Sequence, residues 1–130
     1  MEDFDHTIQA LGQIRLFHGI RREGLALLAG IGKEETYRVG ESIFREGDPG
    51  GSLYLILEGA VRISREVGGM GEEALTVLRA GEAFGEMALI DSSPRSADAK
   101  AHERVRLLVV TREALEEVLF LRKDLAYEVL

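Results

Sequence analysis

Cysteine is absent from this 130-residue sequence, so neither a disulfide framework nor a thiolate metal site can form. Long hydrophobic runs are absent too, because the longest, such as Leu53–Leu57 and Leu107–Val110, are far too short to span a bilayer. The acidic start, Met1-Glu2-Asp3-Phe4-Asp5, lacks the basic-then-apolar pattern of a secretory signal. These absences predict a cytoplasmic protein without membrane insertion.

Positive charge is also in deficit. The chain has 16 Lys and Arg against 23 Asp and Glu, a formal net charge of −7 at pH 7. A surface for a nucleic-acid polymer needs clustered cations, whereas the arginines here are scattered among more numerous carboxylates. The balance therefore argues against a nucleic-acid partner. A small anion can still bind, because one buried arginine sets a local potential that the global charge does not cancel.

The overall composition is that of one globular domain over residues 1–130. Apolar residues make up 45% and charged residues 30% of the chain, and the length leaves no room for a second domain of ordinary size. Three- and four-residue apolar spacing at Ile8, Leu11 and Ile14, and again over 25–31, predicts helices within residues 1–33. Gly30 and Gly32 are expected to end the second helix.

From residue 34 the apolar period switches to two. Tyr37 and Val39 alternate with polar neighbours, as do Leu75 and Val77, while 53–57 is continuously apolar, as in a strand covered on both faces. Glycine-rich turn signals separate these runs. About seven or eight short strands over residues 34–111 predict a mainly β fold with flanking helices, an eight-stranded jelly roll or β-roll.

Helical spacing returns over residues 112–130. Thr111 is the expected N-cap, and Leu115 belongs to one apolar face. The stretch 121–130 keeps four-residue spacing to the last residue. Three interpretations stay open: the natural chain continues past residue 130, another chain completes that face, as an effector domain or a second copy in a homodimer would, or the helix frays there.

The segment 81–97 interrupts the strand pattern. Gly85 permits a turn or a close approach that a side chain would block, residues 86–90 favour a short helix, and Pro94 ends the excursion. The start of such a helix presents unpaired N–H groups that suit an anion. Arg95 then returns a guanidinium to the same place, and a guanidinium can hold two phosphate oxygens at once.

Glu86 indicates what else the ligand carries. A carboxylate repels phosphate, but it can accept a hydrogen bond from a sugar hydroxyl. One ligand with an anionic phosphate and a free ribose hydroxyl therefore satisfies both Glu86 and Arg95. Ser96 and Ala97 are small enough to let such a ligand lie against the backbone.

The strand that follows places only methyl groups on one face, at Ala97, Ala99 and Ala101. Such a face underfills a core unless bulky side chains or a ligand occupy the space. We expect bulky partners opposite Ala99 and Ala101, and the ligand beside Ala97.

Phe84–Ile90 together with Pro94–Ala97 resembles the phosphate-binding cassette of cyclic-nucleotide-binding domains, which occur in cAMP receptor proteins, cAMP-dependent kinase regulatory subunits and nucleotide-gated channels. The similarity runs from about Ile14 to the C-terminus. It includes Gly40–Asp48 and Ser52–Gly59, which match the turns and the central strand of that family's β-roll.

The resemblance implies roles for individual residues. The cassette glutamate, here Glu86, would accept from the ribose 2′-hydroxyl, and the cassette arginine, here Arg95, would pair with the cyclic phosphate. Backbone amides near Gly85, Glu86 and Ala97, with the small Ser96, would complete the phosphate cradle. The ligand-binding set over cassette residues 84–97 is then Gly85, Glu86, Met87, Ala88, Arg95, Ser96 and Ala97.

The resemblance also bears on which base the domain prefers, and the sequence departs from the family pattern at two places. In several cGMP-selective members a hydroxyl at the Ser96 position contacts guanine, but serine also occurs there in cAMP binders, so we expect cAMP with cGMP as runner-up. Gly51 stands where many members carry an acidic residue, a change that loosens that turn without touching ligand. The last helix is short, and Leu125 or Tyr127 is the candidate lid over the base.

The leading prediction is a cyclic-nucleotide-binding regulatory module that has no metal or cofactor and catalyses nothing. The bound phosphate would draw loop 85–91 inward, so that Met87, Leu89 or Ile90 repacks against the C-terminal helices. A first alternative is an interaction or oligomerisation module that kept the fold but lost nucleotide binding, although the intact Glu86 and Arg95 pair argues against it. A second is a β-barrel metalloenzyme, opposed by histidines 6, 18 and 102, which show no ligand spacing.

Overall fold

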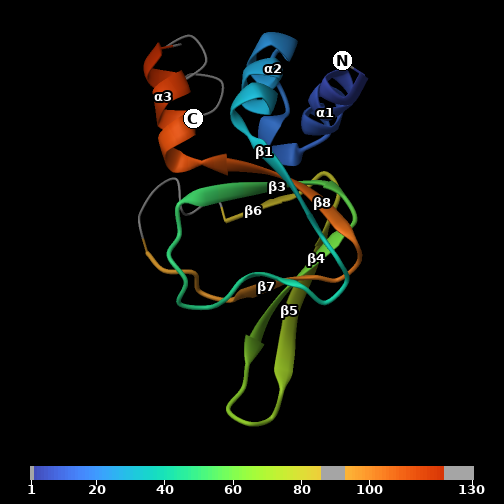
Figure 1. The fold of residues 1–130 in the computed structure, drawn as a ribbon, viewed down its shortest axis with the longest axis vertical. Coiled ribbons are helices and arrows are strands. Elements are labelled where there is room, and N and C mark those ends of the chain that lie inside the picture. Colours follow the sequence, from blue (N-terminus) through green and yellow to red (C-terminus); the bar gives the residue numbers. More distant parts are fainter. Residues whose placement is uncertain (1, 86–92, 122–130) are drawn as a thin grey trace.

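Figure 1 shows the computed structural model, which describes residues 2–85 and 93–121. The elements in chain order are α1 (Glu2–Gly12), the short 3-10 helix η1 (Arg15–Phe17), α2 (Arg22–Ile31), β1 (Lys33–Tyr37), β2 (Ser42–Phe44), β3 (Ser52–Glu58), β4 (Ala60–Glu66), β5 (Glu72–Arg79), β6 (Ala83–Phe84), β7 (Asp98–Ala101), β8 (Val105–Thr111) and α3 (Arg112–Leu121).

The strands form two antiparallel four-stranded sheets. One sheet has the order β1-β8-β3-β6 and the other the order β2-β7-β4-β5. The helices gather at one end of the molecule, beyond the sheet that contains β3 and β8, and the β4–β5 hairpin projects away from them (Figure 1). The described residues thus confirm the predicted mainly β fold, an eight-stranded β-roll with flanking helices.

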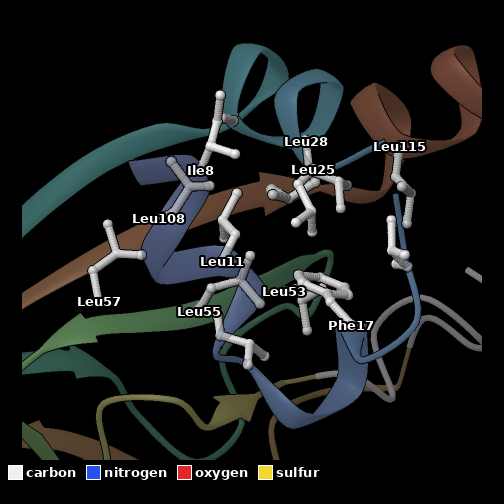
Figure 2. Packing of buried hydrophobic residues seen from close by; sticks show 14 residues of the cluster. Ile8, Leu11, Phe17, Leu25, Leu28, Leu53, Leu55, Leu57, Leu108 and Leu115 are labelled. Atoms are coloured by element: carbon white, nitrogen blue, oxygen red, sulfur yellow. The ribbon is translucent and has the colours of Figure 1, made fainter. Parts of the chain in front are cut away.

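The central strand β3 separates two hydrophobic cores. Leu53, Leu55 and Leu57 pack toward the helices, whereas Ile56 points into the roll. The side chains of the neighbouring strand β8 also alternate between the two cores. The core between β3, β8 and the helices is called the helical core, and Figure 2 shows Leu108 among its leucines. The continuously apolar run is therefore covered on both faces, as predicted. Each buried leucine contributes about 1.5–3 kcal/mol through removal of apolar surface from water.

The N-terminal helices α1 and α2 are joined by a short connector that contains η1. Phe17 in η1 is buried and anchors it in the helical core (Figure 2). The prediction that Gly30 helps to end the second helix was wrong, because Gly30 lies inside α2 and Gly32 is the C-cap. A Cβ at Gly32 would lie 2.6 Å from the side chain of Leu108. Gly32 therefore lets α2 end directly against β8.

Two strand assignments were wrong in detail. The alternation predicted Val39 in the first strand, but β1 ends at Tyr37 and Val39 is 69% exposed. The chain turns there because Gly40 has a φ of 87° and its N–H donates to the carbonyl of Ala101 in β7. Leu75 was predicted to alternate inward with Val77, yet Leu75 is exposed and Leu78 packs into the roll. Leu75 falls where the β4–β5 register shifts, a bulge that redirects side chains.

The start of the C-terminal helix agrees with the sequence. The Thr111 hydroxyl accepts the backbone N–H of Ala114 at 3.1 Å, which confirms the predicted N-cap, and Leu115 is buried in the helical core. The predicted apolar face over 121–130 lies outside the described residues apart from the position of Leu121 in α3, and so do the candidate lid residues Leu125 and Tyr127. In the described part of the chain, no helix has the length and apolar character needed to cross a membrane.

Candidate functional site

Arg95 lies where the chain returns from the cassette to β7, and its backbone is tied to the turn after β2. The N–H of Arg95 donates to the carbonyl of Asp48 at 2.8 Å, and the N–H of Gly47 donates to the carbonyl of Arg95 at 2.8 Å. These two bonds align the segments like neighbouring strands. The backbone from which the side chain of Arg95 extends is therefore fixed to the turn after β2.

The guanidinium of Arg95 is held by backbone carbonyls and aromatic rings. Its Nη2 donates to the carbonyl of Ser52 at 3.0 Å, and its Nη1 lies at 3.5 Å from the carbonyl of Gly85. The guanidinium carbon lies 4.4 Å from the ring centre of Phe44 and 5.5 Å from that of Tyr54. A cation over an aromatic face is attracted by the negative charge of that face.

The positive charge of Arg95 has no carboxylate beside it in the part of the chain that the structure describes. None of the ion pairs there includes Arg95, and its Nε is buried without a hydrogen-bond partner. Burial raises the pKa of the Tyr54 phenol above its ordinary value, although the nearby Arg95 opposes that rise. Tyr54 is thus neutral at physiological pH and does not offset the cation.

Gly85 makes room for this arrangement. Its φ is 80°, a left-handed conformation that residues with a side chain rarely adopt. A Cβ there would lie 2.8 Å from Nη1 of Arg95 and 2.9 Å from the carbonyl oxygen of Ser52. The close approach expected at Gly85 is confirmed, and the group that approaches it is the guanidinium of Arg95.

The residues after Arg95 divide between surface and core. Ser96 is exposed, and its carbonyl accepts from Nε of Arg65 at 3.2 Å, whereas Ala97 is buried. Ala99 and Ala101 pack within the core of the roll against bulky residues, as predicted. That Ala97 faces a ligand stays a prediction.

Three predicted site residues, Glu86, Met87 and Ala88, lie outside the described residues. The convergence of Glu86 with Arg95 on one ligand, on which the sequence argument depends, therefore stays a prediction. The structure places Gly85 and Arg95 in contact, with Ser96 and Ala97 following along the chain.

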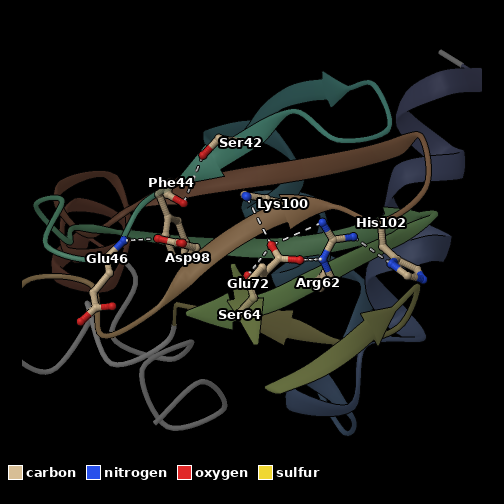
Figure 3. A network of polar contacts seen from close by, with 9 residues as sticks. All are labelled: Ser42, Phe44, Glu46, Arg62, Ser64, Glu72, Asp98, Lys100 and His102. Atoms are coloured by element: carbon tan, nitrogen blue, oxygen red, sulfur yellow. Dashed lines mark hydrogen bonds and ion pairs between the residues drawn. The ribbon is translucent and has the colours of Figure 1, made fainter. Parts of the chain in front are cut away.

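A separate polar network covers the outer face of the second sheet (Figure 3). The Glu72 carboxylate accepts from Ser64 at 2.9 Å, from Arg62 at 2.8 Å, and lies 3.3 Å from Nζ of Lys100. The hydrogen bond from Ser64 is the largest of the effects that lower the pKa of Glu72, and the two cations add to it. The network is electrostatically satisfied, so we assign it a structural role.

Asp98 on the same face helps to fix the turn beside Arg95. Its Oδ1 accepts the backbone N–H of Glu46 at 2.7 Å, and its side chain is buried (Figure 3). A cleft of about 550 Å³ adjoins this bond, lined by Arg45, Glu46, Gly47, Glu66, Asp98 and Lys100. Its two cations face three carboxylates, so the lining does not favour an anion, unlike the surroundings of Arg95.

Sequence reasoning missed the groups that surround Arg95. Phe44, Ser52 and Tyr54 entered only as parts of the segments Gly40–Asp48 and Ser52–Gly59, without a role at the site. A usable signal was present, because Tyr54 is the one aromatic residue in the aliphatic run 53–57. These three residues contact the guanidinium only because the fold brings distant segments together, and spacing along the chain does not reveal such contacts.

With this geometry established, comparisons with known proteins identify the family. The model of the family described as "Cyclic nucleotide-binding domain" matches residues 34–121, more than half of the chain. A solved structure of the N-terminal domain of a transcriptional regulator from Streptomyces coelicolor superposes with a TM-score of 0.85 at 33% identity, covering 92% of this chain and 84% of that one.

Two curated relatives differ in the nucleotide that their names carry. The cyclic AMP receptor protein of Thermus thermophilus is 43% identical over 75% of this chain and 45% of its own length. A cGMP-dependent protein kinase of Toxoplasma gondii is 30% identical over 90% of this chain and 11% of its own length. The chain thus spans about half the length of the bacterial regulators that it matches. In agreement with the resemblance of its cassette, the chain belongs to the cyclic nucleotide-binding domain family.

Proposed function

We propose that this chain binds a cyclic nucleotide, cAMP in preference to cGMP, through the guanidinium of Arg95, and that it regulates a partner rather than catalysing a reaction. The observation that carries the proposal is the buried Nε of Arg95, which has no hydrogen-bond partner. An unpaired buried donor on a cation is costly and is satisfied best by an anionic acceptor. A cyclic phosphate, which bears one negative charge, fits that requirement.

The local geometry supports a phosphate rather than a carboxylate of the protein as the missing partner. Ser52 and Gly85 occupy the amino groups of Arg95 only in part, so Nε and a remaining amino hydrogen can donate to two oxygens of one ligand. Gly85 precedes residues whose sequence favours a short helix, and the N–H groups at a helix start add further donors. These contributions favour a small anion over a bulky one.

The ribose and base are assigned from the sequence and the relatives. We propose that Glu86 accepts from the ribose 2′-hydroxyl, since a carboxylate beside a phosphate needs a donor to offset the repulsion. Met87, Ala88, Ser96 and Ala97 then border the ligand. The higher identity to a cAMP receptor protein than to a cGMP-dependent kinase supports cAMP as the preferred nucleotide.

Calorimetric titration tests this assignment with three ligands. We expect cAMP to bind more tightly than cGMP, and 2′-deoxy-cAMP to bind more weakly than cAMP, because Glu86 loses its hydrogen-bond donor. Absorbance near 260 nm establishes first that the purified protein carries no nucleotide. Heat with neither cAMP nor cGMP would reject cyclic-nucleotide binding and favour an interaction module that has kept only the fold.

The hydrogen bonds around Arg95 also suggest how binding reaches the C-terminal helix. Arg95 donates to the carbonyl of Ser52, and the preceding carbonyl, that of Gly51, accepts the N–H of Arg112 at 2.8 Å. Arg112 is the first residue of α3. We propose that a phosphate drawing Arg95 and loop 85–91 inward shifts this turn and changes the packing of α3. An effector domain or a second copy would receive the change through residues 112–130.

Hydrogen–deuterium exchange tests the coupling. On saturation with cAMP we expect slower exchange in the segments around Arg95 and a changed exchange rate in residues 112–121, because both are bonded to the same turn. The β4–β5 hairpin tip near Met70, which is 85% exposed, serves as an internal control and should not change. Protection confined to the cassette, with no change in 112–121, would contradict the proposed coupling.

A further inference from the structure

We propose that Phe44 is a positioning residue for Arg95: its ring supports the guanidinium in the orientation that receives the ligand phosphate. This inference rests on the proposed function in one respect: its binding experiment assumes that the chain binds a cyclic nucleotide. It starts from a contact that neither the sequence motifs nor the family match assigns, the 4.4 Å separation between the guanidinium carbon and the centre of the Phe44 ring.

A partly buried guanidinium needs something to offset the water it has lost. An arginine side chain stays charged at all physiological pH values, so it cannot relieve burial by losing its proton. Among the described residues no carboxylate pairs with Arg95. The aromatic face and two backbone carbonyls are the groups that the structure supplies instead. The Phe44 ring therefore contributes electrostatically as well as by packing.

The surrounding contacts show why Phe44, rather than another ring of the cluster, has this role. Phe84 stacks on Tyr54 with ring centres 4.9 Å apart and an interplanar angle of 8°, and among the described residues no guanidinium lies over Phe84. Tyr54 itself lies farther from Arg95, at 5.5 Å. Phe84 and Tyr54 thus form a stacked pair, and Phe44, tilted against both at 5.6–5.9 Å, carries the cation.

The same ring is also fixed relative to the backbone of Arg95. Phe44 ends β2, and the turn that follows immediately contains Gly47 and Asp48, whose backbone groups bond to Arg95 on both sides. The ring and the backbone of the arginine are therefore linked through the same turn. Carbonyls hold one edge of the guanidinium and the ring holds one face, which leaves Nε as the donor that has no protein partner.

The orientation of Arg95 can be measured without ligand. In the ligand-free protein we expect the Arg95 Nε–H signal in ¹H–¹⁵N NMR spectra to be shifted by the ring current of Phe44 and protected from solvent exchange. Phe44→Leu should move it toward the signals of exposed arginines, whereas Phe84→Leu should not. Pentafluorophenylalanine at position 44 keeps the ring's shape but reverses the charge on its face, and it should increase exchange at Nε. An unchanged signal in Phe44→Leu or in the fluorinated protein overturns the inference.

Binding provides the second arm. Phe44→Leu should weaken cAMP binding by roughly 3- to 30-fold, the range expected for a partly desolvated cation over a ring. Phe44→Tyr, which keeps the aromatic face, should stay within about twofold of wild type. On an Arg95→Ala background Phe44→Leu should add no further loss, because its effect acts through the guanidinium.

The outcomes separate the two proposals. An equal loss from Phe44→Leu with and without Arg95 assigns Phe44 a packing role only and overturns the inference. A wild-type protein that binds no cyclic nucleotide refutes the proposed function, and the ligand-free NMR signal then decides whether Phe44 positions Arg95.

Discussion

Replacing Arg95 with alanine is expected to weaken cAMP binding by about 2–5 kcal/mol, a factor between roughly 30 and several thousand. The loss is large because the side chain would be the main cation facing the phosphate and its Nε is buried without a partner. Arg95→Lys should recover only part of it, since an ammonium keeps the charge but lacks the planar fork that grips two oxygens. Calorimetric titration of both variants with cAMP measures the effect.

Arg45→Ala is the matched control for this experiment. Arg45 lies in the turn whose backbone bonds to Arg95, but its own side chain is exposed and borders the outer cleft. Its loss removes the same charge from the same region and should change binding by less than about threefold at moderate salt. If Arg95→Ala bound cAMP as tightly as wild type, the assignment of the phosphate site would be wrong.

Gly85→Ala should reduce cAMP binding nearly as much as removal of Arg95. The added methyl group would lie 2.8 Å from Nη1 of Arg95 and 2.9 Å from the Ser52 carbonyl oxygen, so the guanidinium has to move away from its position beside Phe44. The left-handed backbone conformation adds a stability cost of about 1–3 kcal/mol. Urea unfolding measures the stability loss, and titration of the folded protein measures binding.

Gly40→Ala separates these two effects. Gly40 has a similar positive φ, 87° against 80° at Gly85, but a Cβ there meets nothing within 4 Å. We expect Gly40→Ala to lose stability from backbone strain and to keep wild-type binding. Equal binding by the two alanine variants would show that Gly85 matters for the backbone alone and not for Arg95.

Much of the fold could be predicted from the sequence because apolar periodicity reports burial directly. The run 53–57 predicted a strand covered on both faces, and Thr111 predicted a helix start, and both are confirmed. The errors at Val39 and Leu75 have a common cause. A glycine turn and a β-bulge each change which face a side chain occupies, and neither leaves a trace in the alternation itself.

The candidate site was predictable only in part. Gly85 was identified because glycine permits a close approach and Arg95 because a guanidinium suits a phosphate, and the structure brings the two together. Phe44 and Ser52 were not, because one comes from β2 and the other from β3, and only the fold brings them to the same guanidinium. Chemistry at a site can be inferred from a motif, whereas the groups that orient it depend on tertiary contacts.

The central claim is that the buried Nε of Arg95 is the donor reserved for a cyclic phosphate. A crystal structure of the protein with cAMP tests it most directly. The account predicts a phosphate oxygen within hydrogen-bond distance, about 3 Å, of Nε, with the guanidinium still resting on Phe44. A complex in which the phosphate binds elsewhere and Nε stays without a partner would contradict it.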